Sequence, residues 1–269
     1  MKFIVANTKG GVGKSTTATQ LLVPYLYENL YKKLNDKVNL IELDDENLDS
    51  KSFANSEILK AEQIKVASGD LEGNLIEKVL GYNDFVIDIG GNKTTTIVLN
   101  KIDELGLIDT LDAIFIPLTD GEQDAINAYK TYRLIKDFNK NIKTFFVLSR
   151  VDENMDLELQ FIDFFGDLKG RINGKKGIIE QIEVNDRNVL KMTNSDVIKY
   201  SRLFATTAYE ISKFDVKALQ EKQKEYIRNK ENEKAIKVTY RIQIVKKAQR
   251  YYQNIFKPAF AKIDEVIGG

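Results

Sequence analysis

The chain has 269 residues, which suits one large α/β domain with room for an appendage. Basic and acidic side chains number 40 each, so no overall positive charge indicates nucleic acid, and any such contact must use a local patch. The sequence has no Cys and no His, which excludes disulfides, thiolate chemistry and the commonest general base and zinc ligand, and leaves carboxylates, lysines and Mg²⁺ to carry any chemistry.

A short apolar run at residues 3–6 predicts a buried strand that leads directly into the glycine-rich stretch 9–16. The run is too short for a signal peptide, and no apolar run approaches the roughly 18 residues needed to span a membrane, so we expect a cytoplasmic protein. The residues from Lys14 to Leu30 predict a helix, which Pro24 should kink or deprive of one hydrogen bond. Strand, loop and helix together predict a phosphate cradle, because successive backbone N–H groups and the helix N-terminus point at the anion.

The stretch Lys-Gly-Gly-Val-Gly-Lys-Ser-Thr resembles the deviant Walker A motif of the ParA/MinD family of dimeric ATPases, with Thr8 where the usual P-loop has Gly. The resemblance implies that Lys14 reaches the β- and γ-phosphates, that Ser15 binds Mg²⁺, and that Lys9 reaches across a dimer to the partner's nucleotide. It assigns ATP/ADP binding to Lys9, Gly10, Gly11, Val12, Gly13, Lys14, Ser15 and Thr16.

The segment 38–41 predicts a second buried strand, and the acidic stretch 42–47 follows it. Carboxylates at this end of a parallel strand suit a Mg–nucleotide site, because ligands bind beyond the carboxyl ends of such strands. The stretch resembles the D-x-D-P-Q element of the same family. In register, Asp44 matches the Asp that positions or activates the attacking water, whereas Glu42 stands at the first Asp and Asp45 and Glu46 replace Pro and Gln.

An apolar strand at 85–89 contains Asp88 and is followed by Gly90 and Gly91, which resembles the Walker B strand of the family. The resemblance implies that Asp88 holds Mg²⁺ through a water and that the glycines let the next loop sense the γ-phosphate. Lys9, Lys14 and Asp44 are thus the expected catalytic residues, and Ser15 and Asp88 are the expected metal-binding residues.

Strand and helix patterns alternate as far as residue 212, with apolar strands typical of a buried sheet. They predict helices at 71–81, 94–107, 125–137 and 155–168, strands at 113–118, 144–148 and 178–184, a basic loop at 170–176 and helical material at 189–212, with 50–80 otherwise polar and mixed. This order predicts an α/β fold with a doubly wound, mostly parallel sheet and helices on both faces, as in P-loop NTPases.

Ser149 and Arg150 follow the strand 144–148. Many members of the family carry Asn near this position to read adenine, and some small plasmid relatives carry Thr-Arg. The resemblance therefore leaves base recognition at this point open.

The composition changes near Phe214, and no acidic side chain occurs between Glu233 and Asp264. We expect an ATPase domain at 1–213 and a basic C-terminal helical extension at 214–269, formed by a long helix that ends near Pro258. Alternation over 238–244 leaves a local strand as an alternative. The extension could supply phosphate contacts to DNA, or it could be an amphipathic helix packed on the domain or on a second subunit.

The family resemblance implies an ATP-dependent homodimer that hydrolyses ATP slowly and acts as a switch. With no DNA-binding domain ahead of the P-loop, the sequence looks like the short plasmid-partition type, which binds DNA non-specifically in the ATP state, is nucleoid-associated and works with a ParB-like centromere-binding protein. One alternative is a MinD-like membrane-cycling ATPase with an interfacial C-terminal helix, although the apolar face is modest and a membrane is not expected. Another is a non-hydrolysing adaptor of a DNA-transfer system.

Overall fold

Seven parallel strands and the helices between them form the protein, in a computed structural model that describes residues 1–44, 49–68, 70–167, 170 and 174–268. The strands are β1 (Lys2–Val5), β2 (Val38–Leu43), β3 (Leu59–Ile64), β4 (Phe85–Ile89), β5 (Ala113–Leu118), β6 (Lys143–Val151) and β7 (Asn188–Thr193). The helices on one side are α3 (Leu71–Gly81), α4 (Lys93–Glu104) and α5 (Glu122–Phe138). Those on the other are α1 (Lys14–Thr17), α2 (Val23–Leu26), α8 (Asp196–Leu203), α9 (Ala208–Ser212), α10 (Val216–Arg228), α11 (Asn232–Tyr251) and α12 (Lys257–Ile267).

The sheet has the order β3-β2-β4-β1-β5-β6-β7, and every neighbouring pair is parallel. From β1 the chain goes to β2 and β3 on one side, returns to β4 beside β1, and then adds β5, β6 and β7 on the other side. Ligands of parallel sheets bind where the connections diverge in this way, beyond the carboxyl ends of the strands. The predicted doubly wound α/β fold is therefore confirmed, and the loop after β1 lies at the switch point.

Alternate side chains of each strand pack into two separate cores. Phe3 and Val5 of β1 face the first core, with the helices α1 and α2 and the C-terminal helices, whereas Ile4 faces the second core, with α3, α4 and α5. This period of two is the strand pattern expected when both faces of a sheet are covered.

The sequence predicted the five inner strands, but it missed both edge strands. β3 pairs only with β2, and Lys60 and Ala61 within it are exposed, so the segment read as polar and mixed. β7 pairs only with β6, and its exposed Lys191 made 188–193 resemble part of a helix. An edge strand buries less of its surface than an inner one, and its apolar pattern is correspondingly weaker.

The strand predicted at 178–184 is wrong, because Ile178–Gln181 and Val184–Asp186 form 3₁₀ turns. The guanidinium of Arg187 donates to the carbonyls of Ile182 and Glu180, which are therefore not available to a ladder. The helix predicted at 155–168 is two short turns, α6 (Leu157–Gln160) and α7 (Ile162–Phe165), and its last residue lies outside the described residues. Phe161 and Phe164 are core residues, as the helical spacing suggested.

Two prolines lie inside long helical runs, and each follows a π-helical turn. The turn Ala18–Leu22 precedes Pro24, and the turn Tyr252–Phe256 precedes Pro258. In each case the residue before the proline donates its N–H five residues back instead of four. A wider turn moves the backbone carbonyls away from the proline ring, so the helix continues.

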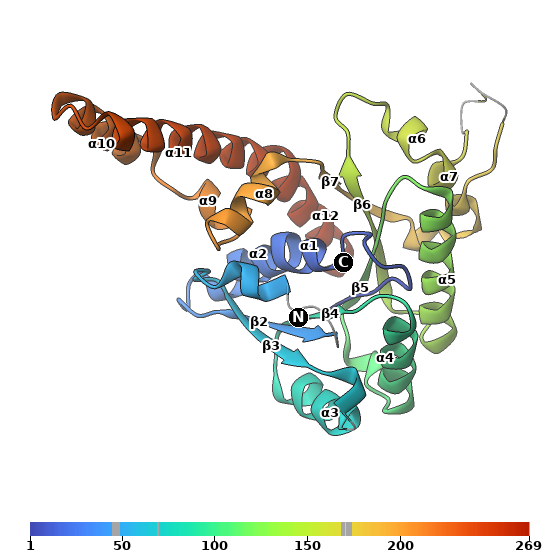
Figure 1. Ribbon diagram of the computed structural model, residues 1–269. Helices are drawn as coiled ribbons and strands as arrows, with labels where there is room; N and C mark the ends of the chain where they lie inside the picture. The colour runs from blue at the N-terminus through green and yellow to red at the C-terminus, as the bar shows by residue number, and fades with distance from the viewer. Residues whose placement is uncertain (45–48, 69, 168–169, 171–173, 269) are drawn as a thin grey trace.

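The predicted end of the C-terminal helix near Pro258 is wrong for this reason, because α12 continues to Ile267. The alternative strand at 238–244 is also wrong, since α11 covers it. α10 and α11 form an antiparallel pair that extends from the body, at the upper left of Figure 1. The later part of this run is core: Val245, Phe256 and Ile263 are fully buried. The boundary at residue 213 remains a prediction.

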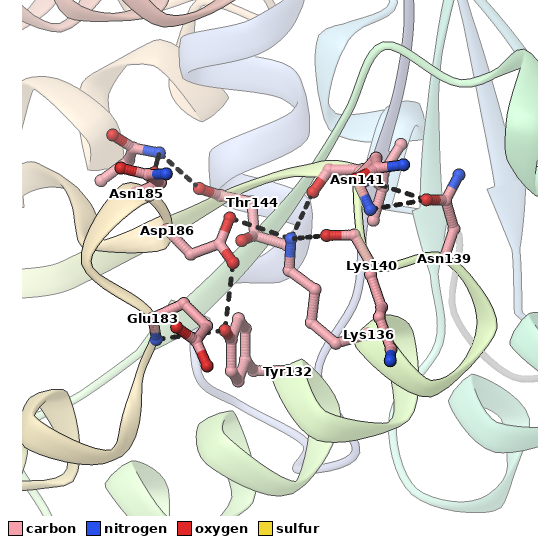
Figure 2. Close-up of polar contacts among 11 residues, drawn as sticks. Tyr132, Lys136, Asn139, Lys140, Asn141, Thr144, Glu183, Asn185 and Asp186 are labelled. Carbon is pink, nitrogen blue, oxygen red and sulfur yellow. Dashed lines mark hydrogen bonds and ion pairs between the residues drawn. The ribbon is translucent and has the colours of Figure 1, made fainter.

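Lys136 on α5 anchors the turn that enters β6 (Figure 2). Its ammonium donates to the carbonyls of Lys140 and Ile142 and to the Asp186 carboxylate, at 3.1, 2.6 and 2.9 Å. Tyr132 donates its hydroxyl to the other Asp186 oxygen at 3.0 Å, and burial together with that carboxylate raises the pKa of Tyr132 to about 12. The network ties α5 to the turns before β7, so it fixes the half of the sheet beyond β5.

We predict that Lys136→Met lowers the free energy of unfolding by about 2–3 kcal/mol, because it leaves a mostly buried carboxylate and two carbonyls without their cation. Urea denaturation followed by circular dichroism measures the change. Lys140→Ala is the matched control, because the exposed Lys140 contributes only its backbone carbonyl. Equal stability of the two variants would contradict the assigned role of Lys136.

Candidate nucleotide site

A cavity of about 330 Å³ lies beyond the carboxyl ends of β1, β2 and β4. Two of its glycines have left-handed backbone angles, Gly11 with φ +75° and Gly13 with φ +98°, a conformation that L side chains rarely adopt. The lining residues are Gly10, Gly11, Gly13, Lys14, Ser15, Thr16, Asp44, Asp88, Ile89, Gly90, Gly91, Arg150 and Arg202. Most of the predicted site residues, from three segments distant in the sequence, therefore line one cavity.

Lys14 is the buried cation of this cavity, with 8% of its surface exposed. Its ammonium donates to the Lys9 carbonyl at 3.0 Å. Burial lowers the pKa of Lys14, and the nearby carboxylates of Asp88 and Asp44 oppose that effect. When a polyanion enters the cavity, the desolvated Lys14 ammonium can exchange its contact with the Lys9 carbonyl for contacts with the anion.

The loop after β4 contacts the start of the P-loop directly. A side chain at Gly91 would lie 3.0 Å from the Gly10 backbone, so any larger residue would push the two loops apart. The Asn92 N–H donates to the Thr8 carbonyl at 2.8 Å, and Asn92 has φ +58°, a left-handed angle that is uncommon outside glycine. The Thr95 hydroxyl lies between the two segments, 2.6 Å from the Gly90 carbonyl and 3.0 Å from the Asn7 carbonyl. A displacement of either loop is therefore transmitted to the other.

Asp44 and Glu42 have different surroundings, although they lie two residues apart. Asp44 lines the cavity and lies against Gly90, where an added side chain would be 2.9 Å from the carboxylate. Glu42 is 2% exposed and accepts from the Ser50 N–H at 2.9 Å and from the Ser50 hydroxyl. Glu42 therefore anchors the chain that leaves β2. Asp45 and Glu46, the other acids of the predicted element, lie outside the described residues.

Lys9 and Val12 are the two predicted nucleotide-binding residues that do not line the cavity. Val12 is buried beneath the loop. The ammonium of Lys9 forms an ion pair with Asp124, a buried carboxylate in the first turn of α5. Nothing in the sequence pattern singled out Asp124, because an acidic residue in the first turn of a helix is common.

Arg150 and Arg202 are additional cations at the cavity; the sequence left the role of Arg150 open and did not assign Arg202 to the site. β6 has an irregular register between Ser149 and Val151, and Arg150 there has φ +59°. Such a bulge redirects one side chain. The Arg150 guanidinium donates to the Gly11 carbonyl at 3.1 Å, which joins the end of β6 to the P-loop.

A second cavity, of about 260 Å³, adjoins the first, and the two share Gly13, Thr16, Arg150 and Arg202. It extends past the ends of β6 and β7 toward α8 and α11. The other lining residues are Ser149, Met192, Thr193, Asn194, Ser195, Ile198, Lys199 and Tyr251. Its mixture of apolar and polar groups is typical of a small-molecule site.

A polar cavity of about 450 Å³ continues from there along α11. Lys199 of α8 and Lys247 and Arg250 of α11 line it. The carboxylates of Glu153 and Asp196 line it too, and the Lys247 ammonium lies 3.5 Å from Asp196.

In the part of the chain that the structure describes, no helix is long and apolar enough to cross a membrane.

Several solved structures are similar to this chain, all at low identity. A plasmid partition protein of Borrelia burgdorferi B31, bound to AMPPNP, is 18% identical, with coverage of 73% of this chain and 88% of its own and a TM-score of 0.45. The MinC:MinD cell division complex of Aquifex aeolicus is 14% identical, with coverages of 76% and 86% and a TM-score of 0.46. Apo McdA of Cyanthece is 13% identical, with coverages of 92% and 98% and a TM-score of 0.44.

No curated protein matches the sequence. The family model described as the CobQ/CobB/MinD/ParA nucleotide binding domain matches residues 3–252, which is most of the chain and includes all of the sheet except Lys2 of β1. The expected relation to ParA and MinD is thus confirmed, and the chain belongs to the CobQ/CobB/MinD/ParA nucleotide-binding family.

Proposed function

We propose that this protein is a dimerising switch ATPase of DNA segregation, of the plasmid-partition type. The observation that carries the proposal is the single cavity in which the glycine-rich loop, Lys14, Asp44 and Asp88 meet. The glycines permit close approach of phosphates to the backbone, and Lys14 supplies a desolvated positive charge. The adjoining cavity at Ser149 offers room for the nucleoside, a role that follows from its continuity with the phosphate cradle.

The residues at this cavity fit a Mg²⁺ ion, because the Ser15 hydroxyl and the Asp88 carboxylate supply the oxygen ligands that this ion prefers. When bound, Mg²⁺ would neutralise phosphate charge. Asp44 would orient the attacking water and accept its proton. Lys14, with Lys9 from the other subunit, would stabilise the charge that develops on the phosphates.

For DNA, we propose the basic surface of Lys199, Lys247 and Arg250, beside the nucleotide site, acting in the ATP-bound homodimer. A MinD-like membrane role is less well supported, since the apolar face of α12 is packed in the core through Ala259, Phe260 and Ile263. We further propose that the protein works with a ParB-like partner protein, because the family resemblance implies one. Measurable ATP turnover would exclude the alternative of a non-hydrolysing adaptor.

Lys14→Ala should abolish binding of labelled ATP, because no other residue presents a buried ammonium to this cavity among those that the structure describes. The matched control is Lys9→Ala, which removes a lysine from the same loop but outside the cavity and should retain ATP binding. Undiminished ATP binding by Lys14→Ala would remove the basis of the proposal.

Asp44→Ala should still bind ATP but hydrolyse it at least about 100-fold more slowly, because it removes the group that accepts the proton of the attacking water. It should accumulate as an ATP-bound dimer, whereas Lys9→Ala should bind ATP as a monomer. Phosphate release and light scattering after size exclusion measure these outcomes. Glu42→Gln is the control, since Glu42 is bonded to Ser50, and it should hydrolyse ATP normally. If Asp44→Ala hydrolyses ATP at the wild-type rate, Asp44 is not the group that accepts the proton of the attacking water.

The triple variant Lys199→Glu, Lys247→Glu and Arg250→Glu should bind DNA at least about tenfold more weakly, with a shallower dependence on salt, because fewer counterions are released. Fluorescence anisotropy at several salt concentrations, with ATP and Mg²⁺, measures both quantities. The control carries the same charge change on α10, at Lys217, Lys222 and Lys224. If the control loses affinity and the first variant does not, DNA binds at α10 instead.

A further inference from the structure

The strand β7 ends the sheet, and among the residues that the structure describes it pairs with β6 alone. Just after β7, the Asn194 N–H donates to the Val151 carbonyl of β6 at 2.9 Å. Backbone groups of successive strand residues point to opposite sides, so those of Val189, Lys191 and Thr193 point away from β6. Such outward groups are a template for a further strand.

A cavity of about 330 Å³ lies against this outer side of β7, and its walls come from both faces of the sheet. Leu157 of α6 and Phe165 of α7 form one wall, and both pack against the second core. Ile255 and Ala259 of the first core form the other wall, together with the exposed ring of Pro258. The edge of β7 therefore lies in a groove between two apolar walls.

The opposite edge of the sheet has a different character. Glu62 of β3 pairs with Lys60 at 3.5 Å and with Lys78 at 3.0 Å, so that edge carries several charged groups. Charged side chains along an edge strand oppose its pairing with other chains. Apolar walls beside β7 instead provide surface that an added strand would bury.

The charge of the groove at β7 indicates which strand it accepts. Lys191 and Lys262 line the groove, and none of the described residues that line it is acidic. Lys191 is exposed, and the half-buried Lys262 pairs with Glu265 at 3.1 Å. Edge-to-edge pairing of two copies would bring their Lys191 side chains together, and like charges on neighbouring strands are destabilising. The groove therefore favours a segment with carboxylates over a second copy of this chain.

We infer that the outer edge of β7 binds an extended segment of a partner protein, apolar in its middle and acidic at its ends, which joins the sheet as an eighth strand. Its main chain bonds to the outward backbone groups of Val189 and Lys191, and its alternate side chains contact the two walls. Three consecutive β7 residues line the groove, so the apolar middle is about three residues long. This interaction surface is separate from the nucleotide site and does not depend on the proposed ATPase activity.

A fluorescein-labelled peptide of sequence Glu-Val-Ile-Val-Glu is the probe, and fluorescence anisotropy with the wild-type chain measures its binding. We expect saturable binding, and binding at least about tenfold weaker when lysines replace both glutamates, because ion pairs become like-charge contacts. N-methyl groups on two successive residues remove a main-chain donor that faces β7 in either strand direction, and should abolish binding. Failure of the unmodified peptide to bind, or undiminished binding of the methylated one, would overturn the inference.

Variants with matched controls locate the binding site. Lys191→Glu with Lys262→Glu should weaken binding of the probe at least about tenfold, whereas Lys143→Glu changes an exposed lysine of β6 outside the groove and should not. Leu157→Ala should weaken binding about fivefold, because it removes part of an apolar wall. Leu159→Ala alters the same turn outside the groove and should have no effect. Equal losses in the groove variants and their controls would refute the assigned surface.

Hydrogen exchange followed by NMR tests the unmodified chain. The probe should slow exchange of the Val189 and Lys191 amides at least about tenfold, because they gain acceptors, and leave the Leu190 amide, which faces β6, unchanged. Unaltered exchange of Val189 and Lys191 at saturating probe would refute strand addition. A dimer of the nucleotide-free chain that Lys191→Glu disrupts would show that a second copy occupies the edge, which would also refute the inference.

Discussion

The position of β1 between β4 and β5 is the constraint on which the site depends. In a parallel sheet the carboxyl ends of neighbouring strands lie at one edge, so the segments that follow β1, β2 and β4 must meet there. The strand register aligns these ends residue by residue, because Val5 of β1 pairs with Asp88 of β4 and Asp88 pairs with Glu42 of β2. The charged groups at these strand ends are thus held by backbone hydrogen bonds of a buried sheet.

Electrostatic balance explains the distribution of cations around that edge. Lys14 is desolvated and faces Asp88 and Asp44, so its charge is opposed by burial and supported by carboxylates. Arg150 is bonded to the P-loop backbone, and Lys9 is paired with Asp124. A triphosphate entering this cavity would find Lys14 and Arg150 already bonded to carbonyls of the P-loop. Its binding must therefore replace existing contacts, which is a physical basis for linking nucleotide occupancy to a change in the loops.

The C-terminal helices contribute to the same site through packing. The π-helical turn before Pro258 lets the helical run continue across the sheet, where Phe256 and Phe260 stack and the Tyr251 hydroxyl reaches the Thr193 carbonyl. Tyr251 lines the cavity next to the P-loop, and Arg250 lines the polar cavity beyond it. The helix α11 thereby connects the proposed nucleoside cavity to the proposed DNA surface. Along the chain, the strands β2 to β7 all lie between the P-loop and α11.

The sequence alone determined the fold class, the five inner strands and the phosphate cradle, because long apolar strands and a glycine-rich loop before a helix are local patterns with few alternative structures. It could not identify the edge strands β3 and β7, whose side chains are buried on fewer sides. It also could not predict that Pro258 would be accommodated, since that depends on a wider turn packed against the core. The pairing of Lys9 with Asp124 and the approach of Arg150 and Arg202 to the P-loop join residues far apart in the chain. Only the tertiary structure decided these contacts, because they result from which strand ends the sheet order brings together and not from any local spacing.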